Sequence, residues 1–318
     1  MIRRRLIAFL LAAALPVLSH AQSYPARQVR YIVPFPPAGA TDIMARNVAQ
    51  VLSDAWGQPV VVENRAGGNA LIGAELASKA PADGYTFLAI TLTHAINATL
   101  FPKAPFDLRR DFIAVSILAS SPMLVVVNPS SPAKTLAELT ALAKSKPLNA
   151  GSSGNGTPPH MGLEQYRQTG GFKATHVPYK GGAPSLTDLV GGQLDFIVSN
   201  LPESIGHVKG GRLRPLALTS RNRHSLVPDV PTTTEAGMPG LSITNWTALL
   251  VPAGTPPEIV ARIQADAAKG LRSPQMTAKV QEQGFEVIGS TSAEAQAFVA
   301  SEIERWSKVV REAGIKAD

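Results

Sequence analysis

Short runs rich in β-branched and apolar residues alternate with helical patterns along most of this chain. The runs lie at 30–33, 59–62, 85–90, 123–127, 174–177, 194–198 and 213–219, with a short one around Leu148. Helical patterns at 41–55 and 135–144 lie between them, and each begins at a threonine that can cap it, Thr41 and Thr135. Strands that alternate with helices predict an α/β fold whose sheets are largely parallel.

Residues 1–21 have the pattern of a secretory signal peptide. Three arginines at 3–5 precede an apolar run over 6–18, and residues 19–21 form a small-x-small cleavage site. The apolar run is shorter than the roughly 20 residues that a transmembrane helix needs. We therefore expect cleavage near Ala21 and export to the periplasm.

The composition of the mature chain excludes several classes of site. The chain contains no cysteine, which in an exported protein excludes disulfides, thiolate catalysis, cysteine zinc sites and a lipid anchor on an N-terminal cysteine. Loss of residues 1–21 removes three arginines and lowers the formal net charge from +7 to +4. Because the mature chain has no run of Lys and Arg, this small excess does not indicate a nucleic-acid partner.

The length of the mature chain indicates two lobes. Single hydrophobic cores stop growing near about 250–300 residues, and 297 residues remain after position 21 of 318. No linker separates two sequential domains, so we expect the lobes to exchange strands, with lobe 1 formed by 22–122 and 245–318 and lobe 2 by 123–244. Two amphipathic patterns near the C-terminus predict core helices, one containing Ile263 and the other Trp306.

Two loops of small residues carry the chemistry, because each follows a predicted strand and precedes a predicted helix. They cover 34–42 and 151–160, and neither contains lysine or arginine. Thr41 opens the helix after the first loop, and Thr157 followed by Pro158 forms a helix start in the second. Either loop alone is explained by a tight turn and a capped helix. One anion-binding helix terminus in each lobe, however, would form a clamp that closes around a small ligand.

Enzyme motifs do not fit the second loop. Its glycines have the spacing of a phosphate-binding P-loop, but Thr157 stands where that motif requires lysine. No G-x-S-x-G elbow occurs, and Ser152 and Ser153 have no obvious paired base. The histidines are scattered without metal spacing, and His160 is better explained as a cap or a pocket residue. We expect no catalytic residue, no metal and no cofactor.

Eight short motifs occur in order at 34–42, 62–68, 83–86, 94–97, 151–160, 177–182, 192–195 and 251–256. Together they resemble the Bug family, the TctC-like receptors of tripartite tricarboxylate transporters, over essentially the whole mature chain. The resemblance implies a type II periplasmic-binding-protein (Venus-flytrap) fold of two α/β lobes joined by crossing strands. It also implies that loop backbone and water, not an arginine, hold the carboxylate of the ligand. Ala38 departs from a frequent glycine of the family, and a positive φ there would strain alanine.

The resemblance also implies the ligand-binding residues, position by position. It places Phe35, Ala38, Gly39, Ala40, Thr41 and Asp42 on one side of the ligand, and Ser152, Ser153, Gly154, Thr157 and His160 on the other. Further candidates at strand ends are Thr91, His94, Asp195 and Asn200. Thr93 belongs to the same wall as Thr91 and His94, and helix capping by Thr93 is the alternative for this segment. A turn before the next strand is the alternative for Asp195.

These observations predict a receptor that binds without chemistry. We expect a monomer that captures a small organic carboxylate between its lobes by hinge closure and presents it to the permease subunits of a tripartite tricarboxylate-type transporter. A periplasmic sensor that feeds a signalling partner would bind its ligand in the same way, and it stays open as the alternative. The sequence does not select one carboxylate.

Overall fold

The computed structural model describes residues 24–312 and 314–315. The predicted signal peptide at 1–21 lies outside these residues. The strands are β1 (Val29–Val33), β2 (Val60–Asn64), β3 (Thr86–Thr91), β4 (Phe112–Val127), β5 (Leu148–Ser152), β6 (Ala174–Pro178), β7 (Phe196–Asn200), β8 (Arg214–Leu218), β9 (Thr244–Pro252) and β10 (Glu286–Val287). The helices are α2 (Ala40–Trp56), α3 (Leu71–Ser78), α4 (Leu92–Leu100), α5 (Leu136–Ser145), α6 (Pro158–Gly170), α7 (Gly182–Val190), α8 (Leu201–Lys209), α9 (Pro257–Leu271), α10 (Pro274–Glu282) and α11 (Ser292–Glu312).

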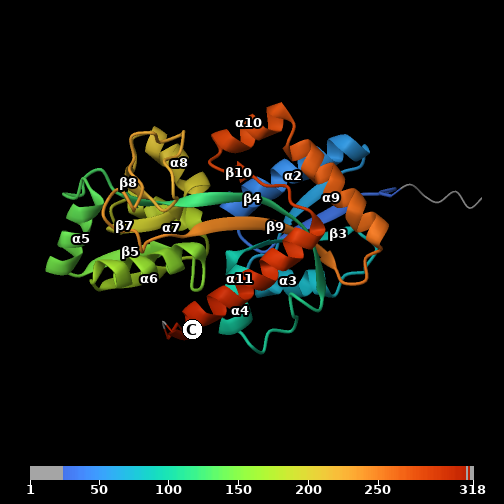
Figure 1. The fold of residues 1–318 in the computed structure, drawn as a ribbon, viewed down its shortest axis with the longest axis horizontal. Coiled ribbons are helices and arrows are strands. Elements are labelled where there is room, and N and C mark those ends of the chain that lie inside the picture. The colour runs from blue at the N-terminus through green and yellow to red at the C-terminus, as the bar shows by residue number, and fades with distance from the viewer. Residues whose placement is uncertain (1–23, 313, 316–318) are drawn as a thin grey trace, which may run out of the picture.

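The strands form one continuous path with the order β2-β1-β3-β9-β4-β7-β5-β6, and β8 and β10 also pair with β4. Figure 1 shows two groups of elements, β1 to β3 with α2, α3, α9 and α10 at one end and β5 to β8 with α5 to α8 at the other. β4 and β9 run between the groups. The two-lobed α/β fold with crossing strands is therefore confirmed. We propose that the lobe boundaries are those predicted from the sequence.

β4 belongs to both lobes because its two parts pair with different strands. Its first part, Phe112 to Pro122, pairs antiparallel with β9, and its second part, Met123 to Val127, pairs antiparallel with β7. The prediction of largely parallel sheets is wrong for these strands. Parallel pairing between the named strands is restricted to β2-β1-β3 in one lobe and β6-β5-β7 in the other, where crossover connections that contain helices join the paired strands.

The same strand order appears in both lobes. In each lobe the first strand of a β-α-β-α-β unit lies between the second and the third. In such an order, the first and third strands are neighbours, and the helices that follow them leave in different directions. This opens a crevice at the carboxyl ends of the two strands. The helices that begin at these ends are α2 and α4 in lobe 1 and α6 and α8 in lobe 2.

The helices agree with the predicted patterns, with one correction. Thr135 caps α5 by accepting a hydrogen bond from the Glu138 backbone N–H at 3.1 Å, as predicted. α2 begins one residue earlier than predicted, so that Gly39, and not Thr41, is its N-cap. The amphipathic faces of α9 and α11 are buried, and Trp306 is the largest fully buried side chain. Among the described residues, no helix is long and apolar enough to cross a membrane.

Candidate functional site

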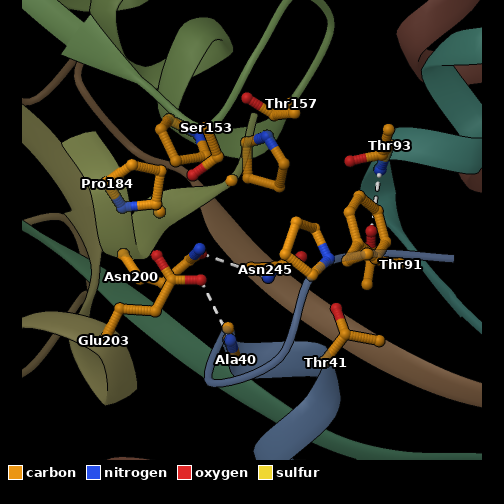
Figure 2. Close-up of a pocket in the computed structure, with 18 of the residues that line it drawn as sticks. Ala40, Thr41, Thr91, Thr93, Ser153, Thr157, Pro184, Asn200, Glu203 and Asn245 are labelled. Atoms are coloured by element: carbon orange, nitrogen blue, oxygen red, sulfur yellow. Dashed lines mark hydrogen bonds between the residues drawn. The ribbon is translucent and has the colours of Figure 1, made fainter. Parts of the chain in front are cut away.

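A cavity of about 80 Å³ lies between the lobes, and the N-termini of five helices meet at its wall (Figure 2). Its lining includes the N-cap residue of each: Gly39 of α2, Thr91 of α4, Thr157 of α6, Gly181 of α7 and Asn200 of α8. The first N–H groups of a helix have no partner within the helix, and the helix dipole makes this end partly positive. The cavity is therefore suited to an anion.

The rest of the lining is apolar or neutral, with one exception. Within the described part of the chain, Glu203 is its only charged side chain, and no Lys, Arg or His lines it. The full lining is Phe35, Pro36, Pro37, Gly39, Ala40, Thr41, Thr91, Thr93, Ser153, Thr157, Pro158, Pro159, Gly181, Gly182, Ala183, Pro184, Asn200, Glu203 and Asn245. Backbone N–H groups, hydroxyls and amides are thus the donors that this cavity offers.

The first loop is held in place by a buried carboxylate. Asp42 accepts hydrogen bonds from the backbone N–H of Ala38 at 3.0 Å, from Arg46 Nε at 2.9 Å and from Asn64 Nδ2 at 2.8 Å. Burial raises the pKa of Asp42, but these hydrogen bonds outweigh burial and the net pKa is lowered. Ala38 has a φ of 65°, so it adopts the left-handed backbone that strains alanine. Asp42 and Ala38 therefore shape the loop from outside the cavity.

The helix start after β3 combines a closed cap with one free hydroxyl. His94 Nδ1 accepts from the Thr91 backbone N–H at 3.2 Å, and Thr91 Oγ1 accepts from the Thr93 backbone N–H at 3.2 Å. The helix cap is thus made by Thr91 and His94 and not by Thr93. Thr93 is fully buried, and among the described residues its Oγ1 has no hydrogen-bond partner. In Figure 2 this oxygen points toward the cavity, where it can donate to a ligand.

The second loop contains a polar cluster behind the cavity wall. The Ser152 hydroxyl lies 2.6 Å from His176 Nε2, and the His176 ring stacks on His160 with 4.0 Å between centroids. His160 Nδ1 accepts from the Gly156 backbone N–H at 3.0 Å. His176 is therefore a base beside Ser152 that the sequence pattern does not reveal. Ser152 nevertheless has no exposed surface, so its hydroxyl cannot reach a substrate, whereas Ser153 lines the cavity without such a base.

The strand ends of lobe 2 place two predicted residues at opposite ends of β7. Asn200 ends β7 at the cavity and accepts from Asn245 Nδ2 of the crossing strand β9 at 3.1 Å. Asp195 precedes the other end of β7, about 16 Å away at the usual rise of an extended chain. Its carboxylate accepts from the Asn149 backbone N–H at 2.7 Å. This contact fits the turn interpretation of Asp195.

The structure therefore divides the predicted residues into two groups. The cavity lining contains Phe35, Gly39, Ala40, Thr41, Thr91, Ser153, Thr157 and Asn200. The cavity lining does not contain Ala38, Asp42, His94, Ser152, Gly154, His160 and Asp195. Contact of the first group with a ligand stays a prediction. Within the described residues, no cluster of three or more His, Asp or Glu side chains is placed to hold a metal ion.

Comparisons with known proteins agree with this geometry. The family model described as the tripartite tricarboxylate transporter family receptor, TctC, matches residues 44–315. The chain belongs to this receptor family. Protein BugT of Bordetella pertussis is 36% identical to this TctC-family receptor over 97% of this chain and 96% of its own length.

Two solved structures show the same fold as this TctC-family receptor. An R. palustris protein solved with adipate has a TM-score of 0.89 at 38% identity, covering 92% of this chain and 99% of that protein. MatC from Rhodopseudomonas palustris, solved with bound malate, has a TM-score of 0.84 at 29% identity and covers 90% of this chain and 100% of its own. The fold and the family are therefore those of binding receptors.

Three features of the receptor's cavity are not apparent from the sequence pattern. Glu203 lies in the first turn of α8, where acidic residues are common for electrostatic reasons alone. Gly182 opens α7, and Asn245 lies on the crossing strand. The sequence does contain a signal for Glu203. Glu203 lies three residues after the end of β7, and the two glycine-containing loops also follow the ends of strands.

We expect the free energy of unfolding of this TctC-family receptor to fall between about pH 6.5 and pH 4. Burial lowers the pKa of His94 to about 3, and burial together with the neighbouring His160 lowers that of His176 to about 4. The unfolded chain, with ordinary histidine pKa values near 6.5, then binds protons that the folded chain does not, and these protons favour unfolding. Above pH 6.5 both states are neutral, so this contribution to stability is fully present.

Urea unfolding at pH 7 and pH 5 measures this effect. Between pH 7 and pH 5, the free energy of unfolding of His176→Gln should fall by less than that of the wild type. The variant lacks one group that becomes protonated only on unfolding. His207 and His224 are shifted in the same direction, so the loss should shrink rather than disappear. An unchanged loss in His176→Gln would show that His176 does not stay neutral in the folded protein.

Proposed function

We propose that this chain is a periplasmic solute-binding protein that captures a small carboxylate-containing ligand between its lobes. It would deliver that ligand to the membrane permease subunits of a tripartite tricarboxylate-type secondary transporter. The single observation that carries the proposal is the meeting of five helix N-termini at one interlobe cavity without a cationic side chain. Such a cavity binds an anion through backbone N–H groups and hydroxyls.

The binding free energy that a receptor needs sets how many donors the cavity must supply. A hydrogen bond to a charged group contributes about 1.5–3 kcal/mol, and micromolar binding needs about 8 kcal/mol net. The free Thr93 hydroxyl and the backbone N–H groups that are not already paired would together have to supply this value, helped by the partly positive helix ends. Since the donors come from both lobes, they act together only when the lobes are closed, which couples binding to the closed shape.

The relatives support a carboxylate as the ligand. The two R. palustris structures contain adipate and malate, which are both small organic acids. The periplasmic location is supported by the predicted signal peptide at 1–21 and by the family to which the chain belongs. A receptor in this compartment would hand over its ligand unchanged.

A ligand panel tests the proposal. Residues 22–318 are unfolded and refolded to remove bound ligand, and thermal melting is recorded with mono-, di- and tricarboxylic acids, amino acids and aromatic acids. A ligand at 100 times its Kd should stabilise the protein by about 2.7 kcal/mol, a shift of several degrees. The neutral amides of the same acids are the matched controls and should produce no shift. If sugars or cations shift the melting temperature and no acid does, the proposal is wrong.

A further inference from the structure

Glu203 places a carboxylate inside a cavity that is built for carboxylates. It extends from the first turn of α8 in lobe 2, and its Oε1 accepts a hydrogen bond from the Ala40 backbone N–H of lobe 1 at 2.9 Å (Figure 2). Ala40 is the first residue of α2. A side chain of lobe 2 therefore occupies the helix terminus of lobe 1 that a ligand anion would otherwise use.

A second helix terminus also lies against this carboxylate. A Cβ atom on Gly182, the first residue of α7, would overlap Glu203 Oε2, and one on Gly39 would lie 3.5 Å from Oε1. Since Glu203 is itself in the first turn of α8, its carboxylate is close to the N-termini of three of the five helices. The Glu203 carboxylate therefore already acts as the anion at the N-termini of α2, α7 and α8.

The carboxylate is partly withdrawn from water at this position. Burial raises the pKa of Glu203, although hydrogen bonds from Ala40 and Asn200 oppose this effect. No Lys, Arg or His lines the cavity within the described residues, so no cation neutralises Glu203 there. A second carboxylate brought next to it would meet like-charge repulsion in a poorly screened space.

The opposite side of the cavity has an unused hydroxyl donor. The N-termini of α4 and α6 line it through Thr91, Thr93 and Thr157, and Figure 2 shows these threonines across the cavity from Glu203. The Thr93 hydroxyl lacks a partner among the described residues. The two sides thus differ: one offers a free hydroxyl and two partly positive helix ends to an anion, and the other offers an acceptor.

We propose that Glu203 is a specificity-determining residue that takes the place of a second ligand carboxylate, so that the cavity selects ligands with one carboxylate and a distal hydroxyl or amine. The carboxylate of the ligand binds at the α4 and α6 termini beside Thr93. The distal group donates to Glu203. This inference rests on the proposed function and defines its ligand class more narrowly.

Matched ligands of equal chain length test the inference by isothermal titration calorimetry on refolded residues 22–318. The pairs are succinate with 4-hydroxybutyrate, glutarate with 5-hydroxypentanoate and adipate with 6-hydroxyhexanoate, and the corresponding ω-amino acids form a third arm. The wild type should bind the hydroxy or amino acid of the preferred length at least about tenfold more tightly than the matched diacid. Glu203→Gln, which keeps an oxygen to accept from Ala40, should remove or reverse this preference.

Glu138→Gln is the control, because Glu138 is also a first-turn acid of a lobe 2 helix but does not line the cavity. It should keep the wild-type preference. A wild type that binds a diacid more tightly than its hydroxy and amino partners overturns the role of Glu203 while leaving the carboxylate receptor intact, and this result needs no variant. If no carboxylate of any kind binds to the wild type or to Glu203→Gln, the proposed function itself fails.

Discussion

Replacing Gly39 by leucine should weaken ligand binding by more than about 100-fold, equal to about 2.7 kcal/mol, while the protein still folds. Gly39 is the N-cap of α2 and lines the cavity with a φ of −78° and a ψ of 164°, a conformation that leucine also adopts. A Cβ atom there meets only Glu203 Oε1 and the Pro36 carbonyl at ordinary distances. The remaining leucine atoms would then compete with a ligand for about 80 Å³ of space.

Thermal melting and calorimetry on the same samples separate folding from binding. The lost glycine cap should cost about 1 kcal/mol or less, a few degrees in Tm for a protein of this size. Gly206→Leu is the matched control, because Gly206 lies on the exposed side of α8 with no atom near its Cβ position. Gly206→Leu should bind as the wild type does. Wild-type affinity in Gly39→Leu would show that the ligand binds outside this cavity.

Trp306→Ala should lower the free energy of unfolding by about 3–5 kcal/mol. Trp306 is 1% exposed and belongs to the core that runs through both lobes along the crossing strands. Its Nε1 donates to Glu302 Oε2 at 3.2 Å, and the same oxygen accepts from Trp246 Nε1 of β9 at 2.9 Å. The change therefore creates a cavity and also disturbs a buried hydrogen-bond group that ties α11 to a crossing strand.

Urea unfolding at pH 7 measures this loss. Phe298→Ala on the same helix is the comparison, because Phe298 is 36% exposed. Water can therefore occupy much of the space that its side chain leaves. Phe298→Ala should cost less than about half as much as Trp306→Ala, since the deleted surface is partly hydrated already. Equal losses in the two variants would mean that α11 contributes to stability by something other than its buried face.

Much of the fold could be predicted because its signals are local. The helix cap at Thr135 and the apolar spacing of α11 can each be recognised from a few neighbouring residues. The structure contains both features. The first part of β4 was missed, since Pro122 and its neighbouring serines interrupt the strand pattern. Pro122 is tolerated at the crossing point, where β4 passes from pairing with β9 to pairing with β7.

The site was predicted less completely because its contacts join distant parts of the chain. The two loops lie at the cavity, as expected from their position after strands. The contact between Ser152 and His176 depends on the parallel register of β5 and β6, which sets Ala150 opposite His176. Glu203 and Ala40 are 163 residues apart, and no spacing within either segment reveals that they meet.

The close approach of Glu203 to Gly182 links two positions that have no other relation in the sequence. Because a Cβ atom at 182 would overlap the end of the Glu203 side chain, any residue other than glycine at 182 would move this carboxylate away from the start of α7. In a receptor with serine or alanine at 203, a side chain at 182 would meet no such carboxylate. The two residues should therefore change as a pair when a receptor of this kind moves from one class of acid to another.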